Sequence, residues 1–335
     1  MDIYLFRRYE FETHYNCSIL TNEEWRAQGQ PSFTIGLINI ISGVFFIAIY
    51  IPCLIVMLRP ELIRYSCFKI MLYLGIIDIV CLSANALLTG VLSLIGSMPC
   101  PYLEYFYPIG CIGIGLWCTQ CAACILLAFN RCVDIWKPRI LKKSFYGKRT
   151  YFWIAACIAY MLYVIMFTRS AFFNSKTYAW YFNPYRDITG VHISDETYYT
   201  NKTHFVNNIV VIVVLPVLYF FLSLSIRWKS RGHTNRNLTR MQIQVTIQSF
   251  FVCLLNFTAA VLYIYMQFFP TPMPVVVFAQ VTWQFSNGGG ALIYLSMNRT
   301  IRRNAMKLVF PKSFARATST VSILHSRSDS FRTYV

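Results

Sequence analysis

The feature that most constrains this chain is a set of seven long apolar stretches separated by polar segments. A helix that crosses the roughly 30 Å hydrocarbon core of a bilayer needs about 20 apolar residues. Six of the stretches contain no charged residue, and the second contains only Asp78. The predicted membrane spans are Ile35–Leu58, Ile70–Ile95, Tyr105–Phe129, Thr150–Thr168, Phe205–Ile226, Met241–Gln267 and Val275–Met297.

The composition agrees with a membrane protein. Only 13% of the residues are charged and 56% are hydrophobic, whereas a soluble chain carries about 25% charged residues. The stretches are continuous and lack the alternation of barrel strands, so they predict helices. Pro270, Pro272 and Pro274 separate the last two stretches, because three closely spaced prolines do not fit one helix interior. We therefore expect an all-α membrane protein, a bundle of seven transmembrane helices.

The basic residues predict the orientation of the bundle. If the N-terminus lies outside the cell, 23 of the 30 lysines and arginines fall in inner segments. Such a bias is typical of cytoplasmic loops. The sequence thus predicts an external N-terminus and an internal C-terminus, and it assigns the net charge of +17 to a membrane face rather than to nucleic acid. The inner segments are Arg59–Lys69, Asn130–Arg149, Arg227–Arg240 and Asn298–Val335.

The remaining segments complete the expected organisation. Residues 1–34 are an extracellular tail, 35–297 the seven-helix domain, 298–311 an amphipathic interfacial helix and 312–335 a disordered cytoplasmic tail. In the short helix an apolar stripe runs between arginines and ends before Pro311; its members are Ile301, Ala305, Leu308 and Val309. The tail ends in Thr333-Tyr334-Val335, a pattern that PDZ scaffolds bind.

Two features are expected on the outer side. Cys17 and Cys100 are the two cysteines clearly outside the membrane, and we expect them to form a disulfide. The alternatives are two free thiols or a different partner such as Cys111. The sequons at Asn16 and Asn201 are candidate glycosylation sites.

Several residues inside the spans resemble landmarks of rhodopsin-type G-protein-coupled receptors. Those receptors carry Asp/Glu-Arg-Tyr at the inner end of helix three; this chain has Asn130-Arg131-Cys132, with Pro138 following. Asp78, Pro216 and Tyr294 match further landmarks. Departures from the pattern are Leu254 and Asn256 in helix six, Gly290-Ala291 before Tyr294, Tyr50 in helix one, and a second outer loop (Phe172–His204) without cysteine.

The departures fit a more specific resemblance. From about residue 15 to residue 305, the chain is similar to the nematode serpentine receptors of class T (Srt). The similar motifs are Tyr15-Asn16-Cys17-Ser18, Asn22-Glu23-Glu24-Trp25, Tyr50-Ile51-Pro52-Cys53-Leu54, Ser66-Cys67-Phe68-Lys69-Ile70-Met71, Asn130-Arg131-Cys132, Tyr265-Met266-Gln267-Phe268-Phe269, Trp283-Gln284, Ile293-Tyr294-Leu295 and Asn298-Arg299-Thr300-Ile301-Arg302.

The resemblance implies a function. It implies a chemosensory G-protein-coupled receptor, without cofactor or enzymatic activity, that binds an external small-molecule chemical and activates a heterotrimeric G protein. Its expected place is the plasma membrane of a sensory-neuron cilium. A seven-span transporter or ligand-gated ion channel is the alternative; Asp78 would then be an ion site, although no inverted repeat is visible.

The expected switch lies at the inner end of the bundle. Arg131 keeps its charge at any pH and can exchange partners when helices shift. Asn130 cannot give it an ion pair, whereas Asp134 can, as a weak i,i+3 pair. This predicts either appreciable basal activity or a different lock on the arginine. The predicted switch residues are Asn130, Arg131, Cys132, Asp134, Asp78 and Tyr294.

The expected ligand pocket lies at the outer end. Aromatic walls with a few amides suit small, weakly polar compounds, although interfacial Tyr and Trp also form belts on any membrane protein. Gly113 stands where aminergic receptors have an aspartate, and helix seven has no lysine that could bind retinal. His204 lies at the start of helix five. The predicted pocket residues are Asn85, Tyr105, Tyr107, Tyr263, Gln280, Trp283 and Gln284, with Tyr102 and Phe106 near them.

The inner loops are expected to contact the membrane surface. A basic cluster there attracts anionic membrane lipids and is also available to a G protein. It consists of Lys137, Arg139, Lys142, Lys143, Lys148 and Arg149.

Overall fold

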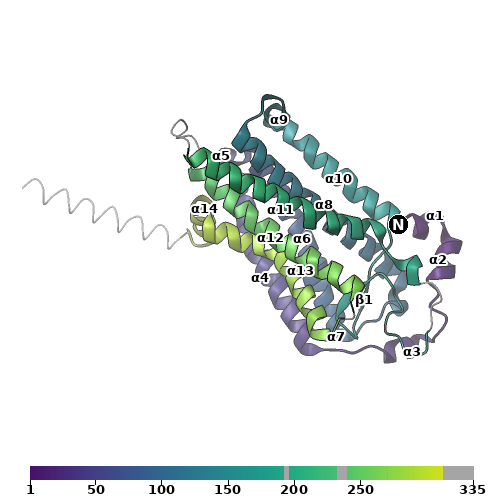
Figure 1. Ribbon diagram of the computed structural model, residues 1–335. Coiled ribbons are helices and arrows are strands. Elements are labelled where there is room, and N and C mark those ends of the chain that lie inside the picture. The colour runs from purple at the N-terminus through teal and green to yellow at the C-terminus, as the bar shows by residue number, and fades with distance from the viewer. Residues whose placement is uncertain (192–195, 232–239, 270, 312–335) are drawn as a thin grey trace, which may run out of the picture.

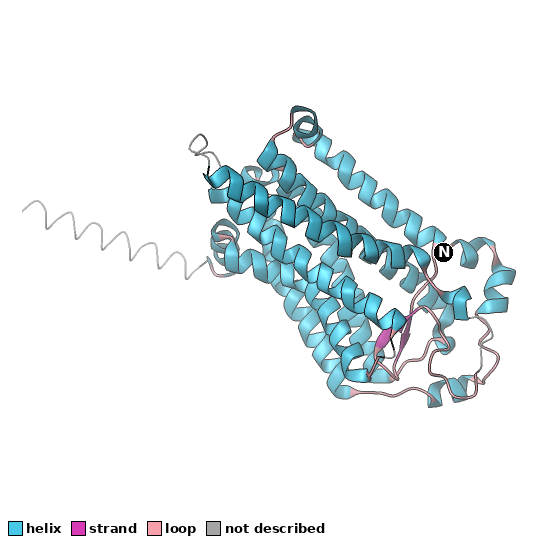
Figure 2. Ribbon diagram, in the orientation of Figure 1, coloured by secondary structure: helices cyan, strands magenta, loops and turns pink. Residues whose placement is uncertain are grey.

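The computed structural model describes residues 1–191, 196–231, 240–269 and 271–311. Long helices run roughly side by side (Figures 1 and 2). The short N-terminal helices and a small hairpin gather at one end of them, and other short helices lie at the opposite end (Figure 1). The tail 312–335, with its predicted PDZ motif Thr333-Tyr334-Val335, lies outside the described residues.

The long helices follow the predicted apolar stretches closely. Six of these helical segments are apolar enough and long enough to cross a membrane. The seventh, α13, has 25 residues but carries several amides and hydroxyls. The long elements of the described chain are α4 (Phe33–Met57), α6 (Ser66–Leu82) with η1 (Ser83–Leu88) and α7 (Thr89–Ile95), α8 (Leu103–Trp136), α10 (Thr150–Phe167), α11 (Lys202–Arg231), α12 (Arg240–Phe268) and α13 (Met273–Met297).

Helix α8 lies at the centre of the bundle. It packs against α6, α10, α11 and α12, and most of its residues are buried. It continues to Trp136 rather than ending at Phe129, because its last turns stay against α11: Trp136 Nε1 donates to Ser225 Oγ at 2.8 Å. A central helix of this length joins the two ends of the molecule.

Shorter elements connect the long helices. At one end a two-stranded antiparallel hairpin pairs Phe172 with Tyr181; we call this the hairpin end and the opposite end, where Arg131 lies, the Arg131 end. The short elements are α1 (Asp2–Phe6), α2 (Arg8–His14), α3 (Asn22–Ala27), α5 (Pro60–Ile63), η2 (Cys100–Tyr102), α9 (Arg139–Ser144), η3 (Gly147–Arg149), β1 (Phe172–Asn174), β2 (Ala179–Tyr181), η4 (Glu196–Tyr199) and α14 (Arg299–Val309).

Residues 1–30, which we call the N-terminal cap, are folded rather than extended. Helix α3 begins with a capping box, in which Thr21 and Glu24 each bond the other's backbone amide. These hydrogen bonds lower the pKa of the Glu24 carboxyl. Tyr15 and Trp25 are buried, and burial raises the pKa of the Tyr15 hydroxyl. The cap therefore shares one apolar core with the helix ends and the hairpin, and it lies at the hairpin end of the bundle (Figure 1).

Candidate functional site

A cavity of about 490 Å³ lies within the hairpin end of the bundle. Its volume falls within the range of small-molecule sites. The described residues that line it include no aspartate or glutamate. They come from α8, the β1–β2 hairpin, α11, α12 and α13, and those used below are Gly110, Trp117, Trp180, Phe182, Arg186, Lys202, His204, Tyr263 and Trp283.

Three aromatic rings form one wall of the cavity. Trp283 of α13 meets Trp117 of α8 edge to face, with ring centroids 6.4 Å apart. Tyr263 of α12 meets Trp283 in the same way at 5.9 Å. Such edge-to-face pairs fix the relative orientation of the rings, so this wall holds the three helices in register.

Helix α11 adds a short chain of polar groups to the cavity. Trp117 Nε1 donates to Asn208 Oδ1 at 2.8 Å, and Asn208 Nδ2 lies 3.4 Å from His204 Nε2. His204 is only 5% exposed and packs edge to face against Phe182 of the hairpin loop. His204 and Asn208 are one helical turn apart, which places them on the same face of α11.

The hairpin is fixed above the helices by specific contacts. Trp180 Nε1 donates to Thr89 Oγ1 at 2.9 Å, and Ser170 Oγ donates to the Tyr107 carbonyl at 2.7 Å. A Cβ at Gly110 would clash with the Ala171 carbonyl. The glycine therefore lets the chain entering the hairpin lie directly on α8.

Two of the seven predicted pocket residues, Tyr263 and Trp283, line this cavity. The other five do not. Tyr105 is 72% exposed on the outside of α8. Tyr107 is fully buried beneath the N-terminal cap, where it stacks on Tyr4 and meets Phe11 edge to face.

The remaining three, Asn85, Gln280 and Gln284, lie in a separate buried network. Gln280 Nε2 and Gln284 Nε2 both donate to the backbone carbonyl of Asn85, at 2.9 and 3.1 Å. Gln284 also donates to Asn39 Oδ1 at 2.6 Å. Asn85 lies in the π-helical turn η1, where the regular helical bonding is interrupted. The two glutamines are thus occupied by the backbone of a neighbouring helix instead of facing the cavity.

Asp78 lies in the middle of the bundle with both carboxyl oxygens occupied. Tyr50 donates its hydroxyl to Oδ2 at 2.6 Å, and Gln120 donates Nε2 to Oδ1 at 2.8 Å. Tyr294 packs edge to face on Tyr50, with ring centroids 6.2 Å apart. The predicted residues Asp78 and Tyr294 are therefore brought together through Tyr50 of α4.

Arg131 is buried at the opposite end of α8. Its Nη2 pairs with Asp134 Oδ2 at 2.5 Å and donates to Asn130 Oδ1 at 2.6 Å. Asn130 Nδ2 in turn donates to Ser66 Oγ of α6 at 2.9 Å. Cys132 Sγ lies 3.9 Å from the Leu218 carbonyl of α11. These residues of α8 thus contact both α6 and α11.

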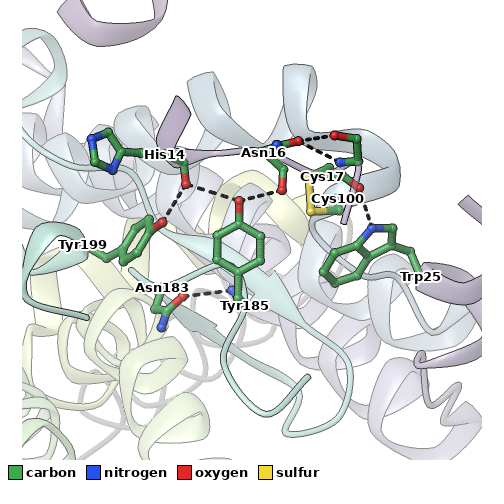
Figure 3. The surroundings of a disulfide bond; sticks show 9 residues. His14, Asn16, Cys17, Trp25, Cys100, Asn183, Tyr185 and Tyr199 are labelled. Carbon is green, nitrogen blue, oxygen red and sulfur yellow. Dashed lines mark hydrogen bonds between the residues drawn. A yellow bond between two sulfur atoms is a disulfide. The ribbon is translucent and has the colours of Figure 1, made fainter. Parts of the chain in front are cut away.

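A disulfide joins Cys17 of the N-terminal cap to Cys100 of η2, the short helix just before α8 (Figure 3). Around it, Trp25 Nε1 donates to the Cys17 carbonyl at 2.9 Å. Tyr185 donates its hydroxyl toward the carbonyls of His14 and Asn16, and Tyr199 donates to the His14 carbonyl at 2.6 Å (Figure 3). The cap is thus hydrogen-bonded to the loop between β2 and α11, which also contributes lining residues to the cavity.

The two candidate glycosylation sites differ in their surroundings. Asn16 is exposed, and its Oδ1 accepts from the Ser18 amide at 2.9 Å. Asn201 is 4% exposed, and its Nδ2 donates to Thr168 Oγ1 and to the Arg169 carbonyl. Its Oδ1 accepts from the His204 amide in the first turn of α11.

Comparison with known proteins identifies the family. The model of the serpentine type 7TM GPCR chemoreceptor family Srt matches residues 2–318. The chain belongs to the Srt family. The resemblance noted from the motifs is therefore confirmed, and the protein is a multi-pass membrane protein of the G-protein-coupled receptor class.

Two similar proteins support this assignment. The Srt protein is 24% identical over 300 residues to serpentine receptor class T-55 of Caenorhabditis elegans, covering 88% of this chain and 80% of that one. It also matches the crystal structure of squid rhodopsin with a TM-score of 0.64, at 14% identity, over 89% of this chain and 91% of the other. The second comparison shows a shared seven-helix fold.

Among the lining residues that the sequence interpretation missed are Trp117, Trp180 and His204. His204 was taken only as the start of a helix. A signal was available, because His204 and the adjacent amides Asn207 and Asn208 lie in an otherwise apolar span. Polar side chains at such positions face the bundle interior or a cavity. No comparable local signal distinguishes Trp117 or Trp180 from an anchoring aromatic residue.

Proposed function

We propose that this Srt protein is a chemosensory receptor that binds an external small molecule in the cavity and activates a heterotrimeric G protein at the Arg131 end. The observation that carries the proposal is that one helix contributes to both places. Trp117 lines the cavity and Arg131 is buried further along α8, about 20 Å away at 1.5 Å per residue. A displacement of α8 at the cavity would therefore reach Arg131 and its partners.

The proposed orientation places the hairpin end outside the cell. The positive-inside bias supports it, since Lys137 and the basic residues of α9 lie at the Arg131 end. These charges are suited to anionic lipid and to a G protein. Helix α14 buries Ile301 and Ala305 against the bundle and exposes Leu308 and Val309. We propose that it lies along the inner membrane surface.

The test is a chemical panel applied to cells that express the full chain. G-protein-dependent second messenger and membrane current are recorded in parallel. A receptor should give a ligand-dependent messenger signal that Arg131→Ala abolishes at unchanged surface expression. Arg64→Ala, which changes an exposed arginine at the same end, should keep the signal. A ligand-gated current that persists without G protein would instead favour the channel alternative.

A further inference from the structure

Two residues that line the cavity each have a buried ring nitrogen without a hydrogen-bond partner among the described residues. These nitrogens are Trp283 Nε1 and His204 Nδ1. Their side chains pack edge to face on the same ring, that of Tyr263, at centroid distances of 5.9 and 6.5 Å. Buried polar groups in folded proteins nearly always have partners, so two unpaired nitrogens on residues that line one cavity call for an explanation.

Both nitrogens are hydrogen-bond donors. An indole N–H can only donate, so Trp283 Nε1 is a donor. The same rule fixes the orientation of the Asn208 amide, because the Trp117 indole requires the Asn208 oxygen as its acceptor. The Asn208 amide nitrogen then donates to His204 Nε2, which accepts. The proton of the His204 imidazole is therefore on Nδ1.

The charges around the cavity restrict what these donors can bind. The charged lining residues of the described chain are Arg186 and Lys202, and no acidic side chain is among them. A cationic ligand would lack a counter-ion. Arg186 is already paired with Asp187 at 3.6 Å, and Lys202 is exposed to solvent, so neither cation is free and buried beside the two donors. An anion held by those two neutral donors would lose hydration that they do not replace. A neutral oxygen acceptor on an apolar skeleton satisfies both donors without this penalty.

We propose that the cavity recognises neutral carbonyl compounds, ketones or esters, whose oxygen accepts the hydrogen bonds that Trp283 and His204 leave unused. This inference rests on the proposed function to the extent that the cavity is the ligand site. An alcohol of the same skeleton binds less well, because its own proton needs a further acceptor. A hydrocarbon leaves both donors unpaired, as they are in the free protein.

The test measures binding to the purified full chain in detergent through its thermal unfolding. Two skeletons are used, each as ketone, alcohol, hydrocarbon and amine: the series of acetophenone, phenylethanol, ethylbenzene and phenylethylamine, and the corresponding series of undecanone. A ligand that binds the folded state raises the melting temperature with its concentration. Ketones should give the largest shift in at least one series. Equal shifts for hydrocarbon or amine, or no shift for either ketone, would overturn the proposal.

A matched pair of variants tests the donors themselves. Trp283→Phe keeps a ring and removes an unpaired N–H, so the melting temperature of the free protein should stay or rise while ketone affinity falls about tenfold relative to hydrocarbon. Trp136→Phe, at the Arg131 end of α8, removes an N–H that is already bonded to Ser225 and lies away from the cavity. It should lower the melting temperature and leave the ketone-to-hydrocarbon ratio unchanged. An unchanged ratio in Trp283→Phe contradicts the proposal.

The unfolding assay is independent of signalling. Donor-dependent ketone binding without any messenger response in cells would refute the receptor function and leave the ligand class intact. A messenger response to amines or hydrocarbons, with no preference for ketones, would refute the ligand class and leave the receptor function intact.

Discussion

The partners of Arg131 depend on the residue that precedes it in the motif. Related rhodopsin-type motifs place an acid at the position of Asn130. Here the amide oxygen of Asn130 and the carboxylate of Asp134 hold the buried guanidinium together, and Asn130 is itself fixed by Ser66. Within the described part of the chain, the arginine is thus held by a neutral amide and by a carboxylate that is partly exposed.

We expect Asp134→Asn to raise ligand-free signalling, because it removes the only charged partner that Arg131 has among the described residues. The pair contributes about 1 kcal/mol, which is roughly a fivefold change in the equilibrium between states. Asn130→Asp should lower ligand-free signalling by adding a second carboxylate. Basal second-messenger levels, normalised to surface expression, measure both effects. Unchanged basal levels in both variants would show that Arg131 is not the switch.

The two sequons lead to a second prediction at this scale. A glycan on Asn201 needs the amide nitrogen that is hydrogen-bonded to Thr168 and Arg169, whereas Asn16 is exposed. Asn16→Gln should therefore abolish the glycosidase-sensitive mobility shift of the expressed protein. Asn201→Gln should leave that shift in place. The opposite pattern would mean that the region around Asn201 opens before the chain folds.

At the scale of elements, the π-helical turn η1 determines how the second span meets the seventh. The turn interrupts the regular helical bonding of the chain, and the Asn85 carbonyl is taken up by Gln280 and Gln284 of α13. Gln284 also connects to α4 through Asn39. Three helices thus share one buried amide network.

Gln284→Leu should destabilise the folded protein by about 1–3 kcal/mol, because it leaves the Asn39 oxygen without this donor in a buried place. The free energy of unfolding in mild detergent measures the loss. Ser296→Ala, on the exposed side of the same helix, serves as the control and should have little effect. An unchanged free energy of unfolding in Gln284→Leu would imply that a water molecule takes the place of the glutamine as donor.

The same element marks the limit of sequence interpretation. Hydropathy predicted the long helices well, since the thickness of the bilayer sets their length. It did not predict which polar residues face the cavity. Gln280 and Gln284 were predicted to line the pocket, yet both donate to the backbone carbonyl of Asn85 in the π-helical turn. Tyr263 and Trp283 do line the cavity, and their rings pack edge to face on each other there.

At the scale of the whole molecule, the N-terminal cap is the largest feature that the sequence did not predict. Its three short helices are too short to be stable alone. They persist because Trp25, Tyr15 and Phe11 are buried against the loop and α8. These contacts are made to distant residues such as Tyr107 and Phe172, so local patterns do not reveal them.

Removing the disulfide should destabilise this arrangement. Cys17→Ser opens a connection that spans 83 residues, and the loss of a bond of this kind costs about 2–4 kcal/mol. The melting temperature should fall, and protease cleavage within the first 30 residues should become faster while the helices stay resistant. The Cys100→Ser variant should behave identically. Different behaviour of the two variants would argue that the cysteines have other partners.

The disulfide also constrains how the protein is made. Between Cys17 and Cys100 the chain contains α4 and the segment from α6 to α7, so it crosses the bilayer twice before the second cysteine returns to the side of the first. A nascent chain that failed to insert either helix would leave the two thiols in different compartments, unable to meet. The closed bond therefore requires that the first two crossings were completed.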